Sequence, residues 1–355
     1  MANEFVQELC ERVAAAAAGK RSLRIRGGGS KDFYGGASAG DILDMGGYSG
    51  IVAYEPRELV LTVRAGTPLE EVERALAAER QMLPFEPPHF AADGASRATI
   101  GGTVATGLSG PRRPYAGSVR DFVLGTRVVN GKAEDLSFGG RVIKNVAGYD
   151  VSRLMTGALG TLGVITEISF KVLPQPRAEA TLAFEMDGDA AIQQANRWAG
   201  QPLPLSATAW QEGVLRVRLS GAETAIDAAR KRLGGEELDG RDYWRDLREH
   251  RLPFFAVGKP LWRLSVPQTA ATFELPSVQL IEWGGGLRWV STDLDADAIR
   301  STVEKVGGHA TLFRGGDKAA GVFHPLQPAI LKIHRRLKLA FDPAGVLNPG
   351  RMYDF

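Results

Sequence analysis

Residues 99–110 read Thr-Ile-Gly-Gly-Thr-Val-Ala-Thr-Gly-Leu-Ser-Gly. Small residues and hydroxyl groups recur throughout this stretch, and such a composition lets a backbone lie close to a diphosphate. Apolar side chains also return at every fourth position, at Ile100, Val104 and Leu108, which argues against a flexible surface loop. The stretch therefore predicts an anchored segment whose backbone contacts a phosphorylated ligand.

Two more glycine clusters flank this stretch in the sequence. The first, Arg26-Gly27-Gly28-Gly29-Ser30-Lys31, directly follows an expected strand. Consecutive glycines let successive amides point into one concavity, as in an anion-binding nest, although a glycine run is more often a plain turn. The second lies within residues 148–163 and leads into another expected strand. None of the clusters has Rossmann or P-loop spacing, so a dinucleotide site here must have another design.

Composition excludes several classes of protein. The chain has 355 residues, 43 basic and 41 acidic, and a net charge of +2. This balance argues against a nucleic-acid-binding or membrane-surface protein. Cys10 is the only cysteine, which excludes an intrachain disulfide and a thiolate-bound zinc or iron–sulfur cluster. We see no targeting segment and no apolar run long enough to span a bilayer.

The order of expected elements divides the chain into three parts. Strands are expected at residues 23–26, 42–45, 58–64, 119–130, 164–172, 181–186, 207–210, 214–219, 261–266, 278–283 and 287–292, and helices at 3–19 (capped by Asn3), 69–79, 189–199, 222–233 and 296–306. We expect one domain at residues 1–176, with subdomains at about 1–98 and 99–176. Residues 177–320 have a strand–helix–strand order that predicts an antiparallel sheet backed by helices. Residues 321–355 form a C-terminal segment.

Four segments together resemble a known family of flavoproteins. The three glycine clusters and the sequence Phe-Asp-Pro-Ala-Gly-Val-Leu-Asn-Pro-Gly-Arg at residues 341–351 are similar to the FAD domain of the vanillyl-alcohol oxidase and p-cresol methylhydroxylase (PCMH) superfamily. Within it, the chain length and residues 142–155 most resemble the FAD-binding subunit of bacterial glycolate oxidase. The resemblance implies an α+β fold, with a two-subdomain FAD-binding domain of the PCMH type and an antiparallel α+β cap.

The resemblance also implies roles for individual residues. FAD would lie extended between the two subdomains, with residues 27–31 around its pyrophosphate and the second subdomain closing over it. Gly163 and Ile165 would lie at the adenine end, and Asn348 and Arg351 near the isoalloxazine ring. The expected cofactor contacts are Arg26, Gly27, Gly28, Gly29, Ser30, Lys31, Pro88, Thr99, Ile100, Gly101, Gly102, Ser109, Gly110, Asp121, Gly148, Tyr149, Gly160, Gly163, Ile165, Asn348 and Arg351. Thr103 and Gly107 stand where the family usually has asparagine, so they are not in this set.

The positions of the histidines and of the cysteine lead to two further expectations, one about the attachment of FAD and one about a metal site. No histidine lies near residues 27–31 and Cys10 lies outside the motifs, so we expect noncovalent FAD. Related 2-hydroxy acid dehydrogenases carry a metal held by paired histidines and a Glu-His-Gly sequence. The five histidines here, His89, His250, His309, His324 and His334, are unpaired in the sequence and no Glu-His-Gly occurs. We therefore expect no metal site, and the sequence identifies no catalytic residue.

Two groups of arginines each allow two interpretations. Arg112 and Arg113 could bind an anion or a partner, but a solvated loop pair is more common. Arg241, Arg245 and Arg248 share one helical face and could hold a substrate carboxylate. Acidic residues are interleaved with them, which favours a salt-bridged surface helix instead.

Three hypotheses for function remain. The first is the FAD-binding component of a glycolate oxidase (dehydrogenase) complex, which oxidises glycolate to glyoxylate and passes electrons through flavin to an iron–sulfur subunit. The resemblance then implies a sister flavin subunit that carries the substrate metal site. The second is a self-contained FAD-dependent oxidase or dehydrogenase of another alcohol or hydroxy acid. The third is a non-catalytic flavin-holding scaffold. In each case we expect a cytoplasmic protein with no nucleic-acid partner, peripheral at the inner membrane only through its partners.

Overall fold

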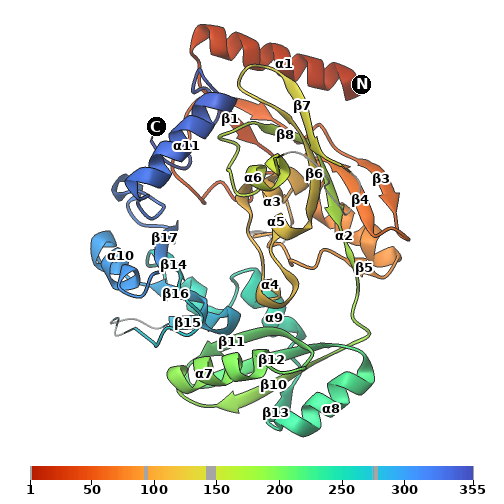
Figure 1. The fold of residues 1–355 in the computed structure, drawn as a ribbon, viewed down its shortest axis with the longest axis vertical. Coiled ribbons are helices and arrows are strands. Elements are labelled where there is room, and N and C mark those ends of the chain that lie inside the picture. The colour runs from red at the N-terminus through yellow and green to blue at the C-terminus, as the bar shows by residue number, and fades with distance from the viewer. Residues whose placement is uncertain (1, 92–94, 141–148, 274, 276–278, 355) are drawn as a thin grey trace.

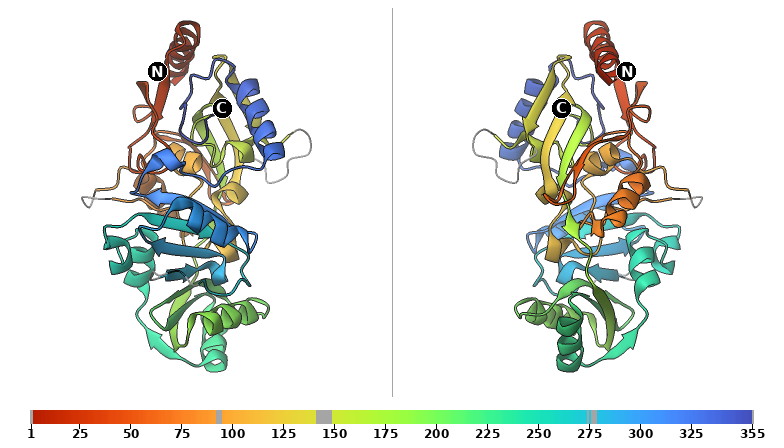
Figure 2. Two further views of the ribbon diagram at one scale, coloured as in Figure 1. Left: turned by 90° about the vertical axis from the view of Figure 1, so that its left-hand side faces the viewer. Right: turned by 90° about the vertical axis from the view of Figure 1, so that its right-hand side faces the viewer.

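The computed structural model describes residues 2–91, 95–140, 149–273, 275 and 279–354. Two bodies lie one above the other in Figure 1. The upper body contains the N-terminal half of the chain and the C-terminal helix α11 (Pro328–Phe341). The lower body is built on one large sheet from residues 178–314. Figure 2 shows the same arrangement from both sides.

A five-stranded antiparallel sheet forms the centre of the upper body. Its order is β3-β4-β8-β6-β7, and two small sheets, β1-β2 and β5-β9, accompany it. The strands are β1 (Leu23–Arg26), β2 (Asp41–Asp44), β3 (Ile51–Glu55), β4 (Val60–Arg64), β5 (Gln81–Met82), β6 (Val123–Val129), β7 (Asp135–Gly139), β8 (Val164–Lys171) and β9 (Leu173–Pro174). Strand β8 is central and six of its eight residues are buried, so protein covers both of its faces.

The helices of the N-terminal half are α1 (Ala2–Gly19), α2 (Leu69–Ala78), α3 (Ile100–Thr106), α4 (Arg113–Ala116), α5 (Val119–Phe122) and α6 (Val151–Met155). Of these, α4 packs against β11 (Leu205–Gln211) of the lower body. Helix α3 packs against β4 and β8 and buries Ile100 and Val104 completely. The spacing of these two anchors was visible in the sequence, but the helix itself was not predicted, because adjacent glycines disfavour a helix interior.

The lower body confirms the expected antiparallel sheet backed by helices. Its strand order is β13-β10-β12-β11-β15-β16-β14-β17, and its strand pairings are antiparallel throughout the described residues. The strands are β10 (Ala178–Glu185), β11 (Leu205–Gln211), β12 (Val214–Gly221), β13 (Glu236–Leu238), β14 (Leu261–Ser265), β15 (Gln279–Glu282), β16 (Leu287–Ser291) and β17 (His309–Arg314). The helices are α7 (Gly188–Ala199), α8 (Glu223–Leu233), α9 (Arg241–Arg248) and α10 (Ala296–Glu304), with short 3-10 turns η1 (Pro253–Ala256), η2 (Trp283–Gly285) and η3 (Lys318–Ala320).

Some expected boundaries were wrong. The strand expected at residues 119–130 begins only at Val123, because Ser118 and Asp121 form a capping box that starts helix α5. Asn3 lies inside α1 instead of capping it. Strands β3, β5, β9, β13 and β17 were not predicted. Of these, β13 is short and mostly exposed, so the sequence carries little strand signal there.

The C-terminal tail (residues 342–354) returns to the first strand of the upper body. The Leu23 amide donates to the Val346 carbonyl at 2.7 Å, and the Asn348 amide donates to the Leu23 carbonyl at 2.9 Å. The Lys338 ammonium of α11 donates to the Thr161 and Leu347 carbonyls at 2.8 and 2.9 Å. The tail therefore lies alongside β1 and is held by hydrogen bonds beside the glycine-rich segments.

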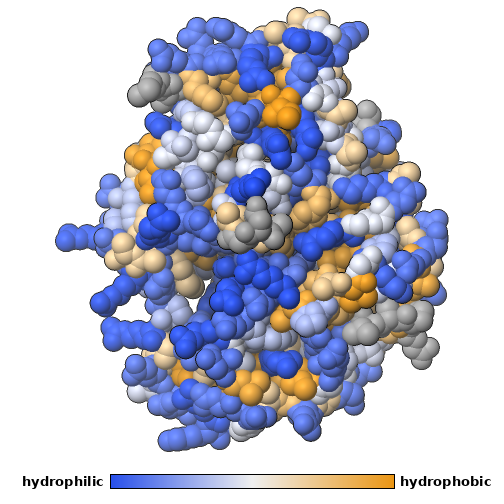
Figure 3. All heavy atoms as spheres, turned by 180° about the vertical axis from the view of Figure 1, so that it is seen from behind, coloured by the Kyte–Doolittle hydropathy of each residue, from blue (hydrophilic) through white to orange (hydrophobic). Residues whose placement is uncertain are grey.

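The surface shows no dominant apolar face in the view of Figure 3. Seen from behind relative to Figure 1, hydrophilic residues cover most of the molecule and apolar residues form scattered groups. Within the described residues, no helix has the length and apolar character needed to cross a membrane.

Candidate functional site

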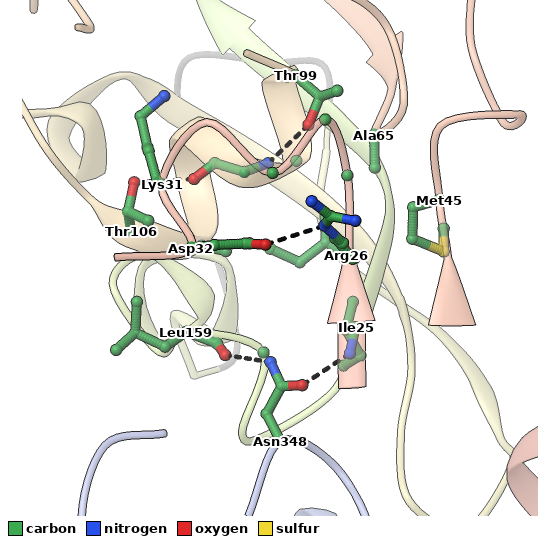
Figure 4. Close-up of a pocket in the computed structure, with 18 of the residues that line it drawn as sticks. Ile25, Arg26, Lys31, Asp32, Met45, Ala65, Thr99, Thr106, Leu159 and Asn348 are labelled. Atoms are coloured by element: carbon green, nitrogen blue, oxygen red, sulfur yellow. Dashed lines mark hydrogen bonds and ion pairs between the residues drawn. The ribbon is translucent and has the colours of Figure 1, made fainter. Parts of the chain in front are cut away.

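A cavity opens where β1, the loop that follows it, helix α3 and the C-terminal tail meet (Figure 4). Its volume is about 100 Å³. Its lining residues are Ile25, Arg26, Gly27, Gly28, Gly29, Ser30, Lys31, Asp32, Met45, Ala65, Thr99, Gly101, Gly102, Ala105, Thr106, Leu159, Gly160, Gly163, Ile165, Asn348 and Arg351.

The glycine loop (residues 27–31) lies directly against residues 97–99. A Cβ atom at position 27 would stand 2.3 Å from Thr99 Oγ1, and one at position 28 would stand 1.5 Å from the Arg97 carbonyl oxygen. Gly29 has a φ of +76°, in the left-handed region. Gly27 and Gly28 are thus required because the backbone lies too close to residues 97–99 for a side chain, and Gly29 is required by its left-handed conformation. The close approach brings the loop next to the start of α3.

Asn348 joins three segments at the opposite wall of the cavity (Figure 4). Its Oδ1 accepts from the Ile25 amide at 2.7 Å, and its Nδ2 donates to the Leu159 carbonyl at 2.6 Å. Gly160 must be small there, because a Cβ would stand 2.7 Å from Asn348 Nδ2. The side chain is buried, so these hydrogen bonds fix the tail to β1 and to the loop before β8.

Three cations line the cavity, and they differ in their partners. Arg26 Nε lies 2.9 Å from Asp32 Oδ2. Arg351 donates to the carbonyls of residues 31, 32 and 36 at 3.2, 3.1 and 3.0 Å and so holds the glycine loop in place. Lys31 is buried and forms no ion pair with a described carboxylate, and burial lowers the pKa of its ammonium to about 8. A buried cation without a carboxylate partner suits an anionic ligand.

Most of the expected cofactor contacts lie in this cavity. These are Arg26, Gly27, Gly28, Gly29, Ser30, Lys31, Thr99, Gly101, Gly102, Gly160, Gly163, Ile165, Asn348 and Arg351. The sequence reasoning missed Met45, Ala65 and Leu159, which are ordinary apolar residues at element ends and carry no local signal. Thr106 was also missed, although it belongs to the same hydroxyl-rich stretch as Thr99.

The remaining expected contacts lie elsewhere. Ile100 is fully buried beneath the cavity wall. Asp121 accepts hydrogen bonds from the amide and hydroxyl of Ser118, both at 2.8 Å, and serves as a helix cap. Tyr149 is 94% exposed and does not line the cavity. Gly148 lies outside the described residues. Pro88, Ser109 and Gly110 line a second, smaller cavity on the side of the lower body.

The structure contradicts the prediction for one group of arginines and confirms the prediction for the other. The solvated pair expected at residues 112–113 is wrong, because Arg112 is buried and lies 3.3 Å from a Glu86 oxygen and 2.6 Å from a Glu179 oxygen. The salt-bridged surface helix is confirmed in α9, where Arg245 Nη1 lies 2.9 Å from an Asp242 oxygen and Arg241 is largely exposed.

The histidines occupy separate positions. His89 Nδ1 lies 2.7 Å from Ser96 Oγ and its Nε2 lies 3.0 Å from Glu73 Oε2. The rings of His309 and His324 lie 6.4 Å apart between centroids. In the part of the chain that the structure describes, no group of three or more His, Cys, Asp or Glu side chains could hold a metal ion.

Comparison with known proteins shows to which family the chain belongs. The chain is 49% identical to the glycolate oxidase subunit GlcE of Escherichia coli over 350 residues, which cover 99% of this chain and 98% of that protein. The chain belongs to the GlcE family. Residues 4–152 also match the FAD binding domain family. This GlcE-family chain is therefore an FAD-binding protein of an oxidoreductase superfamily, as the resemblance of its four segments implied.

More distant matches agree with this fold. The chain is 34% identical to the glycolate oxidase subunit GlcD of Bacillus subtilis over 144 residues, which cover 40% of this chain and 30% of that protein. The structure of alkyldihydroxyacetonephosphate synthase superposes with a TM-score of 0.66 at 16% identity and covers 97% of this chain and 75% of that one. The second match confirms the PCMH-type α+β fold of this GlcE-family member.

The cavity fits FAD chemically. Its wall combines glycines whose Cβ atoms would collide with neighbouring backbone, a buried lysine that pairs with no described carboxylate, and apolar side chains such as Met45 and Leu159. A diphosphate needs close backbone amides and positive charge, whereas flat aromatic rings need apolar contacts. Both requirements are met in one continuous site.

Proposed function

We propose that this chain is the FAD-binding component of a glycolate oxidase complex. The observation that carries the proposal is the identity to E. coli GlcE over the whole chain, together with a cavity built jointly by the glycine loop, α3 and the tail. FAD would supply the hydride acceptor for the oxidation of glycolate to glyoxylate. Electrons would pass through the flavin to an iron–sulfur partner subunit. In this proposal the chain acts in the cytoplasm and reaches the inner membrane only through its partners.

The same proposal assigns tasks to the cavity residues. Gly27, Gly28 and the start of α3 would hold the pyrophosphate, and Lys31 would neutralise part of its charge. Gly163 and Ile165 would contact the adenine end, whereas Asn348 and Arg351 would fix the wall near the isoalloxazine ring. The contacts are hydrogen bonds and packing only, and we propose that FAD is bound noncovalently.

The complex would divide its work between subunits. The match to Bacillus subtilis GlcD covers 144 residues, which are 40% of this chain. A GlcD-like sister flavin subunit would carry the metal that binds the glycolate hydroxyl and carboxylate as a Lewis acid. A self-contained oxidase is the second candidate, and the polar residues of the smaller cavity favour it.

Anaerobic reduction distinguishes these functions. The chain would be purified alone and with its co-expressed partner subunits, and each sample mixed with millimolar glycolate or D-lactate while the flavin absorbance is followed. The proposal expects rapid bleaching by glycolate only when the partners are present. Rapid bleaching of the chain alone would contradict the division of work and favour the self-contained oxidase. Flavin that never bleaches during turnover of the complex would contradict a redox role.

A further inference from the structure

Helix α11 lies on the outside of the upper body (Figures 1 and 2). None of its 14 residues is buried. On its inner side, Leu337 and Phe341 pack against the core of the upper body. The Lys338 ammonium also ties this side to the Thr161 and Leu347 carbonyls. The helix is therefore fixed on one side, and its other side faces outward.

Helix α11 exposes several large apolar side chains. Ile330, Ile333 and Leu339 are 43%, 53% and 64% exposed. They are three of the eight large apolar or aromatic side chains that are exposed in the described residues, and the other five lie on other segments. A single exposed apolar residue is ordinary, whereas a group on one element is typical of an interaction surface.

Cations lie among these apolar side chains. Lys332, Arg335 and Arg336 are exposed, and none of them forms an ion pair with a described carboxylate. The helix itself contains no acidic residue. At about 100° of rotation per residue, Lys332 and Arg336 fall between Ile333 and Leu339 on the outward side. The apolar side chains therefore form no continuous strip that could insert into a bilayer, and an acidic protein surface is the better complement.

The C-terminal tail connects this helix to the FAD cavity. Asn348 and Arg351 line the cavity, and the ring of Tyr353, two residues further, lies 5.9 Å from the His334 ring of α11. The Tyr353 hydroxyl donates to the His324 carbonyl at 3.1 Å, which fixes the end of the tail. The rate of electron transfer falls steeply with distance, so a partner that takes electrons from the flavin must bind close to this cavity. Helix α11 is in contact with the segment that forms one of its walls.

We propose that the outward face of α11 (Lys332, Ile333, Arg335, Arg336 and Leu339) is the docking surface for the iron–sulfur partner subunit, which meets it with acidic side chains around an apolar patch. The choice of this partner rests on the proposed function, whereas its acidic and apolar character rests on the helix alone. Ile333 and Leu339 supply the apolar contacts, and the cations pair with carboxylates of the partner.

Co-purification of the complex tests this proposal. The tagged full chain would be co-expressed with its partner subunits, and the amount of each subunit per chain measured after washing at low and at raised salt. Lys332→Glu combined with Arg336→Glu reverses two charges on the face. We expect this double variant to retain less iron–sulfur subunit than wild type by at least about tenfold, because like charges then oppose each other across the contact. Raised salt should weaken retention by wild type, since it screens exposed charges.

A second double variant tests the apolar contacts. Ile333→Gln combined with Leu339→Gln keeps every charge and should lower retention at both salt concentrations. The control is Arg57→Glu combined with Lys231→Glu, which makes the same change of charge at two exposed positions outside α11 and should assemble like wild type. The substituted side chains are exposed and lie outside the FAD cavity, so flavin content and thermal midpoint should equal those of wild type in each variant.

Several results would overturn the docking proposal. These are equal retention of the iron–sulfur subunit by wild type and both α11 variants, equal loss in the control, and loss of the sister flavin subunit alone. Binding of the wild-type chain to phosphatidylglycerol vesicles, abolished by a charge reversal that leaves the complex intact, would assign the face to a membrane instead. Glycolate oxidation by a complex whose assembly is insensitive to α11 would contradict only the docking proposal. A complex that assembles through α11 but leaves glycolate unoxidised would contradict only the proposed function.

Discussion

Gly28 packs against the backbone carbonyl of Arg97: a Cβ at position 28 would stand 1.5 Å from that oxygen. This contact joins the glycine loop to the segment that leads into α3, two of the walls of the FAD cavity. Any side chain at position 28 must therefore push the walls apart, whatever its charge.

We expect Gly28→Ala to lose FAD binding. The added methyl group cannot be accommodated without a backbone shift, and overpacking of this kind costs about 1–3 kcal/mol of stability. The bound flavin per chain after purification and the urea midpoint measure both effects. An alanine variant with full flavin content and wild-type stability would show that this contact is not made.

Gly102 offers a matched pair of substitutions. A Cβ there would approach only Thr99 Oγ1, at 3.3 Å, so Gly102→Ala should keep most of the FAD binding. Gly102→Asp should abolish FAD binding, because its carboxylate would face the pyrophosphate, and like charges at about 4 Å repel by several kcal/mol at an effective dielectric near 20. Fluorescence titration of the apoprotein with FAD compares the two variants. Equal affinities in alanine and aspartate variants would place the pyrophosphate elsewhere.

Asn348 should contribute to stability as well as to the cavity. Asn348→Leu leaves the Ile25 amide and the Leu159 carbonyl without their partners, and we expect a loss of about 2–4 kcal/mol in the free energy of unfolding. Asn348→Asp keeps an acceptor for Ile25 and should lose less. Urea unfolding measures both. A leucine variant as stable as wild type would mean that water or a backbone shift replaces these bonds.

Lys31 should make FAD affinity depend on pH. Burial lowers the pKa of Lys31 to about 8 in the protein without ligand, so the side chain is charged below that pH and neutral above it. A bound anion favours the charged form, so binding above pH 8 requires uptake of a proton. Affinity should be constant below about pH 7.5 and fall by at most about tenfold per unit above about pH 8.

The control for this profile is Lys31→Gln. It should bind FAD more weakly at neutral pH and show no decline of affinity between about pH 8 and 9. Isothermal titration in buffers of different ionisation enthalpy would also show the proton uptake directly. A glutamine variant with the same pH profile as wild type would assign the titration to another group.

Local patterns in the sequence predicted most elements of the lower body, because β10, β11, β12, α7 and α8 each carry regular apolar spacing, but they did not predict β13 and β17. They failed at α3, where the pair Gly101-Gly102 opposes a helix and only packing of Ile100 against the sheet stabilises one. They also failed at Arg112, which was expected in solvent. Its partners Glu86 and Glu179 are distant in the sequence and meet it only after the two bodies fold together.

The candidate site shows the same limit. The glycine loop and Thr99 stand out in the sequence because their composition is unusual. Met45, Ala65 and Leu159 do not, since they reach the cavity only through the chain path of the folded protein. The resemblance implied that Asp121 contacts the cofactor. In the structure Asp121 caps helix α5 together with Ser118, three residues earlier. This capping pattern was not recognised in the sequence, because a strand was expected over residues 119–130.

The flavin content of the purified chain tests the central claim most directly. The full chain would be saturated with FAD, freed of excess cofactor and precipitated with acid, and the supernatant and pellet analysed by absorbance and chromatography. We predict one FAD per chain, all of it in the supernatant. Flavin that stays with the pellet would contradict noncovalent binding, and a folded chain that retains no FAD would contradict the assignment of the cavity.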